Sequence, residues 1–270
     1  MKGEKKFFTV SQIDGASTGS PHQRELEEVA AAKFSLFKGL EKGTLQRIVY
    51  EDLGAKLGNL GLNEDWTITL EFFPEANIHV SYFYYGDEFS DLEGELKFLF
   101  SGERVHWIPG EDLVTYTSIV LDFIEQIIRR RQPSEKDYNK KTELMKSVLE
   151  QRKEPFNFLR EEDINELGKF VGGEVLKTGL TWNIKKEVFP QINVEIIFDK
   201  DKNMLDVAYS GENLTKIGSY HIELISVFII NHILRYITIK NQDKKLPNIC
   251  YKMFSRLFTK EKGWDYRRAT

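Results

Sequence analysis

Hydrophobic and polar residues alternate in two short stretches that begin with Trp and end with Phe-Pro. The first is "WTITLEFFP", from Trp66 to Pro74, and the second is "WNIKKEVFP", from Trp182 to Pro190. Aligned without a gap, they share Trp, Ile, Glu, Phe and Pro at matching positions. A period of two is typical of a strand with one buried face, and proline ends such a strand because it cannot donate to the ladder. The two stretches therefore predict equivalent strands of a duplicated unit.

Helical periodicity surrounds both stretches. A Ser20-Pro21 pair opens a first amphipathic helix, and long apolar helices are predicted over roughly 112–131 and 220–239. The words "LGAKLG" (53–58) and "LGKFVG" (167–172) are predicted to end the helices before the two Trp stretches, and "SGE" follows them at 101–103 and 210–212. Four markers in the same order predict an α+β fold of two tandem repeats, each with a helix, antiparallel strands and a long helix.

The same markers suggest where the parts of the chain begin and end. We expect a flexible N-terminal arm over 1–20, a first α+β repeat over 21–132, a helical linker over 133–160, a second α+β repeat over 161–240, and a basic aromatic C-terminal helix and tail over 241–270. The order of elements resembles the duplicated saddle of the TATA-binding protein. That likeness concerns architecture and implies no DNA binding.

Composition narrows the class of protein. The 270 residues are 41% hydrophobic, enough for a sizeable core, and the net charge is −4, which provides no overall field toward nucleic acid or an anionic membrane. The single cysteine, Cys250, excludes a disulfide framework and a cysteine-ligated cluster within the chain, and its apolar neighbours indicate packing. The longest apolar run, "IELISVFIINHIL", carries Glu223 and His232 and predicts a buried helix. We therefore expect a cytoplasmic protein with no membrane segment.

The first clear difference between the copies is an acidic insertion. The interval from Trp to "SGE" is seven residues longer in the first copy, and the surplus falls in "YYGDEFSDLEGELKF", which contains Asp87 and Glu88. Carboxylates this dense repel one another unless they are solvated or bound to cations. A Ca²⁺ or Mg²⁺ site is the functional interpretation, although the spacing matches no EF-hand. We favour a solvated acidic hairpin.

The second difference lies at the start of the long helices, where "HWIPGEDL" (106–113) in the first copy replaces "TKIGSYHI" in the second. Glu111 or Asp112 would complement the positive end of the helix dipole, which is the interpretation we favour. With His106 they also form a candidate metal or acid–base group. The candidate metal ligands are Asp87, Glu88, His106, Glu111 and Asp112.

Familiar catalytic motifs are absent from the sequence: there is no Walker loop, dinucleotide fingerprint, G-x-S-x-G elbow or H-E-x-x-H. The C-terminal tail from Lys240 carries nine cations, three acids and interleaved aromatic residues, a combination that can bind nucleic acid. An apolar stripe at helical spacing in the same tail favours a docked, solvated helix instead.

Residues 65–113 also resemble a known family. The features that match are Asp65, Phe73-Pro74, the "GDEF" at 86–89, Leu99-Phe100 and the "IPGEDL" at 108–113. They resemble an uncharacterised domain family of anaerobic bacteria and archaea, whose members are sometimes labelled metal- or iron–sulfur-associated. The resemblance implies an intact domain and no particular mechanism. Because this chain lacks the cysteines that such a label requires, no iron–sulfur cluster is expected.

Three functions follow from these patterns. Duplicated lobes predict a groove for a small ligand or a protein partner, so the leading prediction is a non-enzymatic binding or accessory protein. The first alternative is a metal-dependent enzyme that uses a divalent cation, the GDEF loop, His106, Glu111 and Asp112. The second is nucleic-acid binding through the basic C-terminal tail. Within the repeats, function is expected where the two copies differ, in the GDEF loop and in the segment that enters the first long helix.

Overall fold

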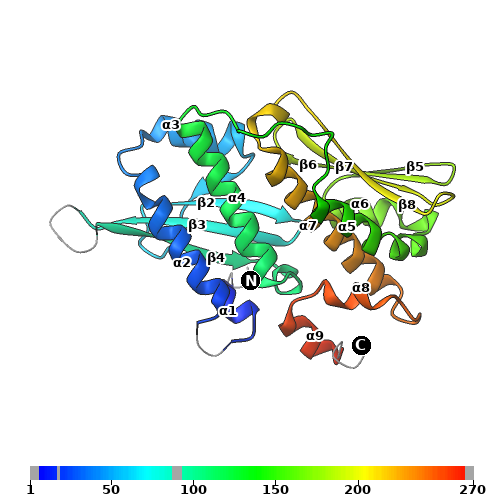
Figure 1. The fold of residues 1–270 in the computed structure, drawn as a ribbon. Coiled ribbons are helices and arrows are strands. Elements are labelled where there is room, and N and C mark those ends of the chain that lie inside the picture. Colours follow the sequence, from blue (N-terminus) through cyan, green and yellow to red (C-terminus); the bar gives the residue numbers. More distant parts are fainter. Residues whose placement is uncertain (1–5, 17–18, 87–92, 265–270) are drawn as a thin grey trace. The chain divides into compact units, whose positions relative to one another are not determined.

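The computed structural model describes residues 6–16, 19–86 and 93–264, and the chain divides into two units (Figure 1). Unit 1 is Met1–Arg131 with Ser255–Leu257, and unit 2 is Gln132–Phe254 with Phe258–Thr270. Each unit contains a four-stranded antiparallel sheet followed by a long helix. The protein is therefore α+β with two tandem repeats, as the sequence predicts.

Unit 1 packs its helices on one face of a sheet with the order β1-β2-β3-β4. The ring of Phe72 stacks on Tyr116 with centroids 4.0 Å apart, and Phe34 stacks on Tyr82 at 5.2 Å, so this face carries the core. Figure 1 shows α2 and α4 crossing that face. The elements are α1 (Val10–Ile13), α2 (Pro21–Lys33), α3 (Lys42–Arg47), β1 (Lys56–Gly58), β2 (Trp66–Phe73), β3 (Ala76–Tyr84), β4 (Gly94–Ser101) and α4 (Gly110–Ile128).

Unit 2 repeats this plan around a sheet with the order β5-β6-β7-β8. In β7 buried positions alternate strictly with half-buried ones, as expected for a sheet with one core face. The elements of the second half of the chain are α5 (Glu143–Arg152), α6 (Ile164–Val171), β5 (Glu174–Thr178), β6 (Thr181–Phe189), β7 (Ile192–Asp199), β8 (Met204–Ser210), α7 (Ser219–Lys240), α8 (Asn248–Lys252) and α9 (Arg256–Lys262).

Helix α7 is the one described helix that is long and apolar enough to cross a membrane by composition. In its most apolar window 89% of the residues are buried inside the protein. It also buries Glu223, whose carboxylate accepts hydrogen bonds from the backbone and hydroxyl of Thr142 at 2.9 and 2.6 Å. Helix α7 is thus a core helix in this structure, as the run with Glu223 and His232 predicts.

The two Trp stretches occupy equivalent strands, as predicted. Strands β2 and β6 each carry a register irregularity just before their final Phe, and each is followed by a turn with a positive φ, 66° at Glu75 and 60° at Gln191. The "SGE" words also match, because Gly102 and Gly211 both lie against the carbonyl of that turn residue. These shared motifs are therefore explained by the backbone geometry that both repeats need at the strand end and at the turn.

The "LG" words were aligned wrongly. The register pairs Leu57 with Ile68 and Val175 with Ile184, so the equivalent left-handed glycines are Gly54 (φ 62°) and Gly172 (φ 71°). In the first copy the helical segment ends at Asp52, in a π-helical turn over Ile48–Asp52, and residues 56–58 form β1. The two LG motifs therefore lie at non-equivalent positions of the repeat. The feature that the two units share is a glycine with a left-handed backbone between the helix and the following strand.

Two other predicted elements are shorter or more ordered than the pattern suggests. Within the predicted arm, α1 forms because Thr9 and Gln12 make a reciprocal capping box, and its Val10 and Ile13 are fully buried. Within the predicted linker, the helix begins only at Glu143, where Thr142 accepts a hydrogen bond from the Met145 backbone. The predicted long helices are confirmed as α4 and α7.

Cys250 is fully buried, and burial raises the pKa of its thiol to about 12. The thiol is therefore protonated at neutral pH, and reagents that react with the nucleophilic thiolate should modify it only after unfolding. We expect Ellman's reagent to leave native protein unmodified for hours and to titrate one thiol in urea. Rapid reaction of the native protein would contradict the buried position.

Candidate functional site

The face of the unit 1 sheet that points away from α2 and α4 is polar, and we call it the outer face. Side chains of directly opposed residues share a face. The opposed pairs on this one include Thr67 with Ser81, Thr69 with His79, and Asn77 with Ser101. Thr67, His79 and Ser81 are buried. This is unusual, because the face of an antiparallel sheet that no helix covers is commonly exposed to solvent.

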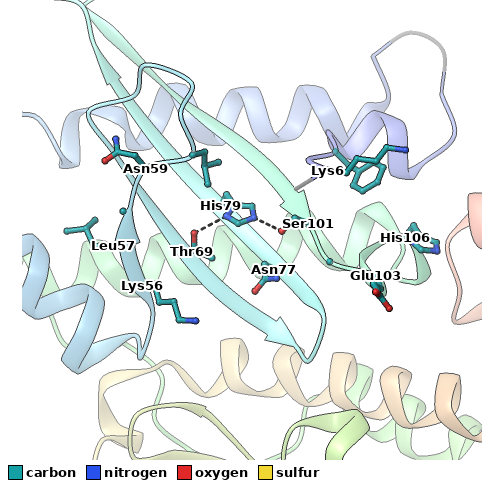
Figure 2. A pocket seen from close by; sticks show the side chains of 14 residues that line it. Lys6, Lys56, Leu57, Asn59, Thr69, Asn77, His79, Ser101, Glu103 and His106 are labelled. Atoms are coloured by element: carbon teal, nitrogen blue, oxygen red, sulfur yellow. Dashed lines mark hydrogen bonds between the residues drawn. The ribbon is translucent and has the colours of Figure 1, made fainter. Parts of the chain in front are cut away.

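His79 lies at the centre of the outer face and is only 5% exposed. Its Nδ1 lies 2.9 Å from the Thr69 hydroxyl and its Nε2 lies 2.7 Å from the Ser101 hydroxyl. Figure 2 shows the ring held between these two groups. The Phe7 ring approaches it edge-on at 5.2 Å. The imidazole is therefore fixed in orientation by neighbours on both adjacent strands and by the N-terminal segment.

The loop between β1 and β2 is organised by Glu64, which is 6% exposed. Its carboxylate accepts hydrogen bonds from the backbone N–H groups of Leu60 and Leu62 and from the Thr67 hydroxyl. The Asn59 amide in turn donates to the Glu64 carbonyl at 2.8 Å. Because Asn59 and Leu60 line the cavity described next, Glu64 determines the shape of one of its walls.

A cavity of about 710 Å³ opens over the outer face. Sites for small molecules are commonly about 300–1,000 Å³, so a ligand of ordinary metabolite size fits. Figure 2 shows Lys56 at one end, Lys6, Glu103 and His106 toward the other, and His79 between them. All the lining residues belong to unit 1: Lys6, Phe8, Lys56, Leu57, Gly58, Asn59, Leu60, Thr69, Asn77, His79, Ser101, Gly102, Glu103 and His106.

The charges around the cavity are mainly positive. Lys6 and Lys56 contribute two cations and Glu103 the one carboxylate among the lining residues. The Lys6 ammonium lies over the Phe8 ring at 5.1 Å from its centroid. Neither lysine forms an ion pair with an Asp or Glu in the part of the chain that the structure describes.

Unit 2 keeps the scaffold and loses this surface. The register makes Glu174, Lys185 and Glu195 the equivalents of Lys56, Thr69 and His79. These three opposed residues alternate in charge across the strands, and none of them is buried. Alternating charges on a solvated sheet face stabilise the strand pairing and need no ligand. The buried polar face with a histidine thus belongs to unit 1 alone.

Sequence reasoning missed His79, Thr69, Ser101 and Lys56. Motifs that occur in both copies indicate what the copies share, and Ser101 belongs to such a motif, "SGE". The signal in the sequence is a pair of chemically different residues at equivalent strand positions of the two units, such as His79 in one and Glu195 in the other. Equivalent positions in β3 and β7 can be assigned only from the strand pairing, because the sequences of these two strands share few residues.

The sequence-predicted candidates are only partly accounted for. His106 lines the cavity from the short helix Val105–Trp107. Glu111 and Asp112 lie in the first turn of α4, Glu111 exposed and Asp112 buried, where they complement the helix dipole. Asp87 and Glu88 fall outside the described residues. Among the residues that are described, no three His, Cys, Asp or Glu side chains are grouped to hold a metal, so the metal site stays a prediction.

No protein-family model, curated protein or solved structure matches this chain. The family resemblance of residues 65–113 therefore stays a prediction, and the geometry of the cavity carries the functional argument.

Proposed function

We propose that the chain is a non-enzymatic binding protein that holds a small polar ligand in the cavity on the outer face of unit 1. The observation that supports this most strongly is the contrast between the copies. His79 is buried between two hydroxyls at the floor of a 710 Å³ cavity, whereas its equivalent Glu195 lies on a solvated face. A polar surface that one copy buries and the other lacks is not required by the shared fold.

The geometry around His79 favours binding over catalysis. A serine nucleophile paired with a histidine base normally needs a third group, usually a carboxylate, to orient the base and stabilise the imidazolium. Ser101 meets the Nε2 of His79, but the Nδ1 faces the neutral hydroxyl of Thr69. The cluster can thus donate to and accept from a ligand, and the group hydrogen-bonded to the Nδ1 of His79 is a hydroxyl where a triad has a carboxylate. We further propose a cytoplasmic location, while the groove between the lobes and nucleic-acid binding by the tail stay predictions.

The test is to fill the cavity. Gly58 is opposed to Thr67, so a side chain placed there lies on the outer face, and a Cβ at this position meets no atom within 4 Å. Because its backbone lies outside the left-handed region, Gly58→Trp should fold while it occupies the cavity. The matched control is Leu176→Trp, at the equivalent and exposed position of unit 2.

A thermal-shift screen of common metabolites, followed by calorimetry on those that bind, supplies the readout. We expect the affinity of the bound compounds to fall roughly tenfold or more in Gly58→Trp, since a tryptophan displaces much of the ligand volume, and to be unchanged in Leu176→Trp. Circular dichroism confirms that both variants are folded. Compounds that bind Gly58→Trp as well as the wild type would disprove the proposed site, as would a screen in which nothing binds.

A further inference from the structure

The geometry points to an anion as the ligand of this cavity, with Lys56 as the residue that contacts its charged group. This inference rests on the proposed function and adds the class of ligand. It concerns a phosphate or a carboxylate group carried by a small molecule.

One row of opposed residues across the unit 1 sheet carries a positive charge. In unit 1 the row runs Lys56, Thr69, His79, Leu99, so its lysine faces no carboxylate. Glu71 lies two residues further along β2 and makes no ion pair with Lys56. A lysine that forms no ion pair with a carboxylate among the described residues is available to contact an anion.

The same row in unit 2 carries a different pattern of charges on the same fold. There, Glu174, Lys185 and Glu195 face one another in alternation, and the row ends in Ala208. Opposite charges on facing strands attract, and the row as a whole carries a net charge of −1. The positive charge of the row in unit 1 therefore arises from different residues at three adjacent positions, and the same fold also accommodates a row of net negative charge.

The hydrogen-bond donors along the cavity are also arranged in a way that suits an anionic ligand. Lys56 stands at one end, and Lys6 and His106 lie toward the other, where Glu103 is the one acidic lining residue (Figure 2). Between them lie neutral groups, including the Asn77 amide. This order of charged and neutral donors fits a ligand whose anionic group lies near Lys56. The rest of the ligand would carry hydroxyl or amide groups and lie along the floor of the cavity. The protein interior beneath the buried floor lowers the local dielectric and strengthens the attraction.

The experiment uses two simple anions and two matched lysine variants. ¹⁵N-labelled protein is titrated with inorganic phosphate and, separately, with acetate at constant ionic strength, and the amide signals of Gly58 and Asn59 are followed. We expect a saturable displacement with at least one anion. Lys56→Met should weaken that binding roughly tenfold or more, in keeping with the loss of a charge-assisted contact. Lys185→Met, at the Thr69 position of unit 2, should leave it unchanged.

The outcomes separate the inference from the proposed function. Saturation by phosphate but not acetate indicates a phosphorylated ligand, and the reverse indicates a carboxylate. If neither anion saturates these signals, or if Lys56→Met binds as the wild type does, the anion assignment is overturned. The proposed function survives that result if neutral compounds bind and are displaced by Gly58→Trp.

Discussion

Replacing Gly102 by alanine is expected to lower the free energy of unfolding by about 2–4 kcal/mol, and replacing Gly211 should cost about the same. Both glycines adopt a positive φ, 110° and 121°, which side-chain-bearing residues rarely accept. A Cβ would also lie 2.0 Å from the carbonyl oxygen of Glu75 or of Gln191. The clash is with backbone, so a side chain cannot rotate to relieve it.

Urea unfolding followed by circular dichroism measures both effects, with Gly43→Ala as the control. Gly43 lies within α3, has no close neighbour for a Cβ and has an ordinary backbone conformation, so alanine there should be neutral or stabilise by about 0.5–1 kcal/mol. If the two units unfold separately, each variant should shift the transition of its own unit only. A loss below 1 kcal/mol at Gly102 or Gly211 would contradict the shared turn geometry.

Replacing Glu64 by alanine is expected to destabilise unit 1 by about 3 kcal/mol. The Glu64 carboxylate is the acceptor for two backbone N–H groups, of Leu60 and Leu62, and for the Thr67 hydroxyl. Alanine would leave these donors without that acceptor, and of the three donor residues Thr67 is buried, Leu60 is half-buried and Leu62 is exposed. Since Asn59 and Leu60 form a wall of the cavity, ligand affinity should fall as well.

The charge of Glu64 also makes this contribution depend on pH. Burial disfavours the charged form, but the hydrogen bonds from the backbone at Leu60, Glu64 and Leu62 outweigh it, so the pKa of Glu64 is lowered. A lowered pKa stabilises the folded state above the unfolded-state pKa of about 4.3, and that stability is lost as pH falls through the folded-state pKa.

Unfolding of wild type and Glu64→Gln at pH 7 and again below pH 4 tests this dependence. The difference in stability between the two proteins should be largest at pH 7 and should shrink as the pH falls, because the wild-type carboxyl becomes neutral like the amide. An unchanged difference over that range would show that the charge of Glu64 contributes nothing.

The sequence predicted those parts of the fold that depend on backbone requirements. The Trp stretches and the "SGE" words survive in both copies because a strand with one core face and a turn that accepts only glycine leave few alternatives. The alignment of the "LG" motifs does not match the structure because a left-handed backbone requires glycine at one position only and does not constrain its neighbours. A similar motif can therefore occur by chance one helical turn away.

The candidate site was less predictable because it depends on register. Whether His79 faces Thr69 or the core is decided by a single residue of strand pairing, and nothing in "ANIHVSYFY" alone fixes that. His106 was selected as a partner of Glu111 and Asp112, yet the structure places it on the cavity while those carboxylates begin α4. The dense charges of the sequence lie in a loop, whereas the cavity is lined by isolated polar residues on all four strands of the unit 1 sheet.

The most direct test of the binding site is the ¹³C NMR signal of His79 in protein labelled at its histidines. The chain has five histidines. His79 and His106 line the cavity, and His221 and His232 lie in unit 2 as internal references. On addition of a compound shown by calorimetry to bind, the His79 signal should move and those of His221 and His232 should stay in place. Saturating the protein with such a compound while the His79 signal remains unmoved would contradict the account.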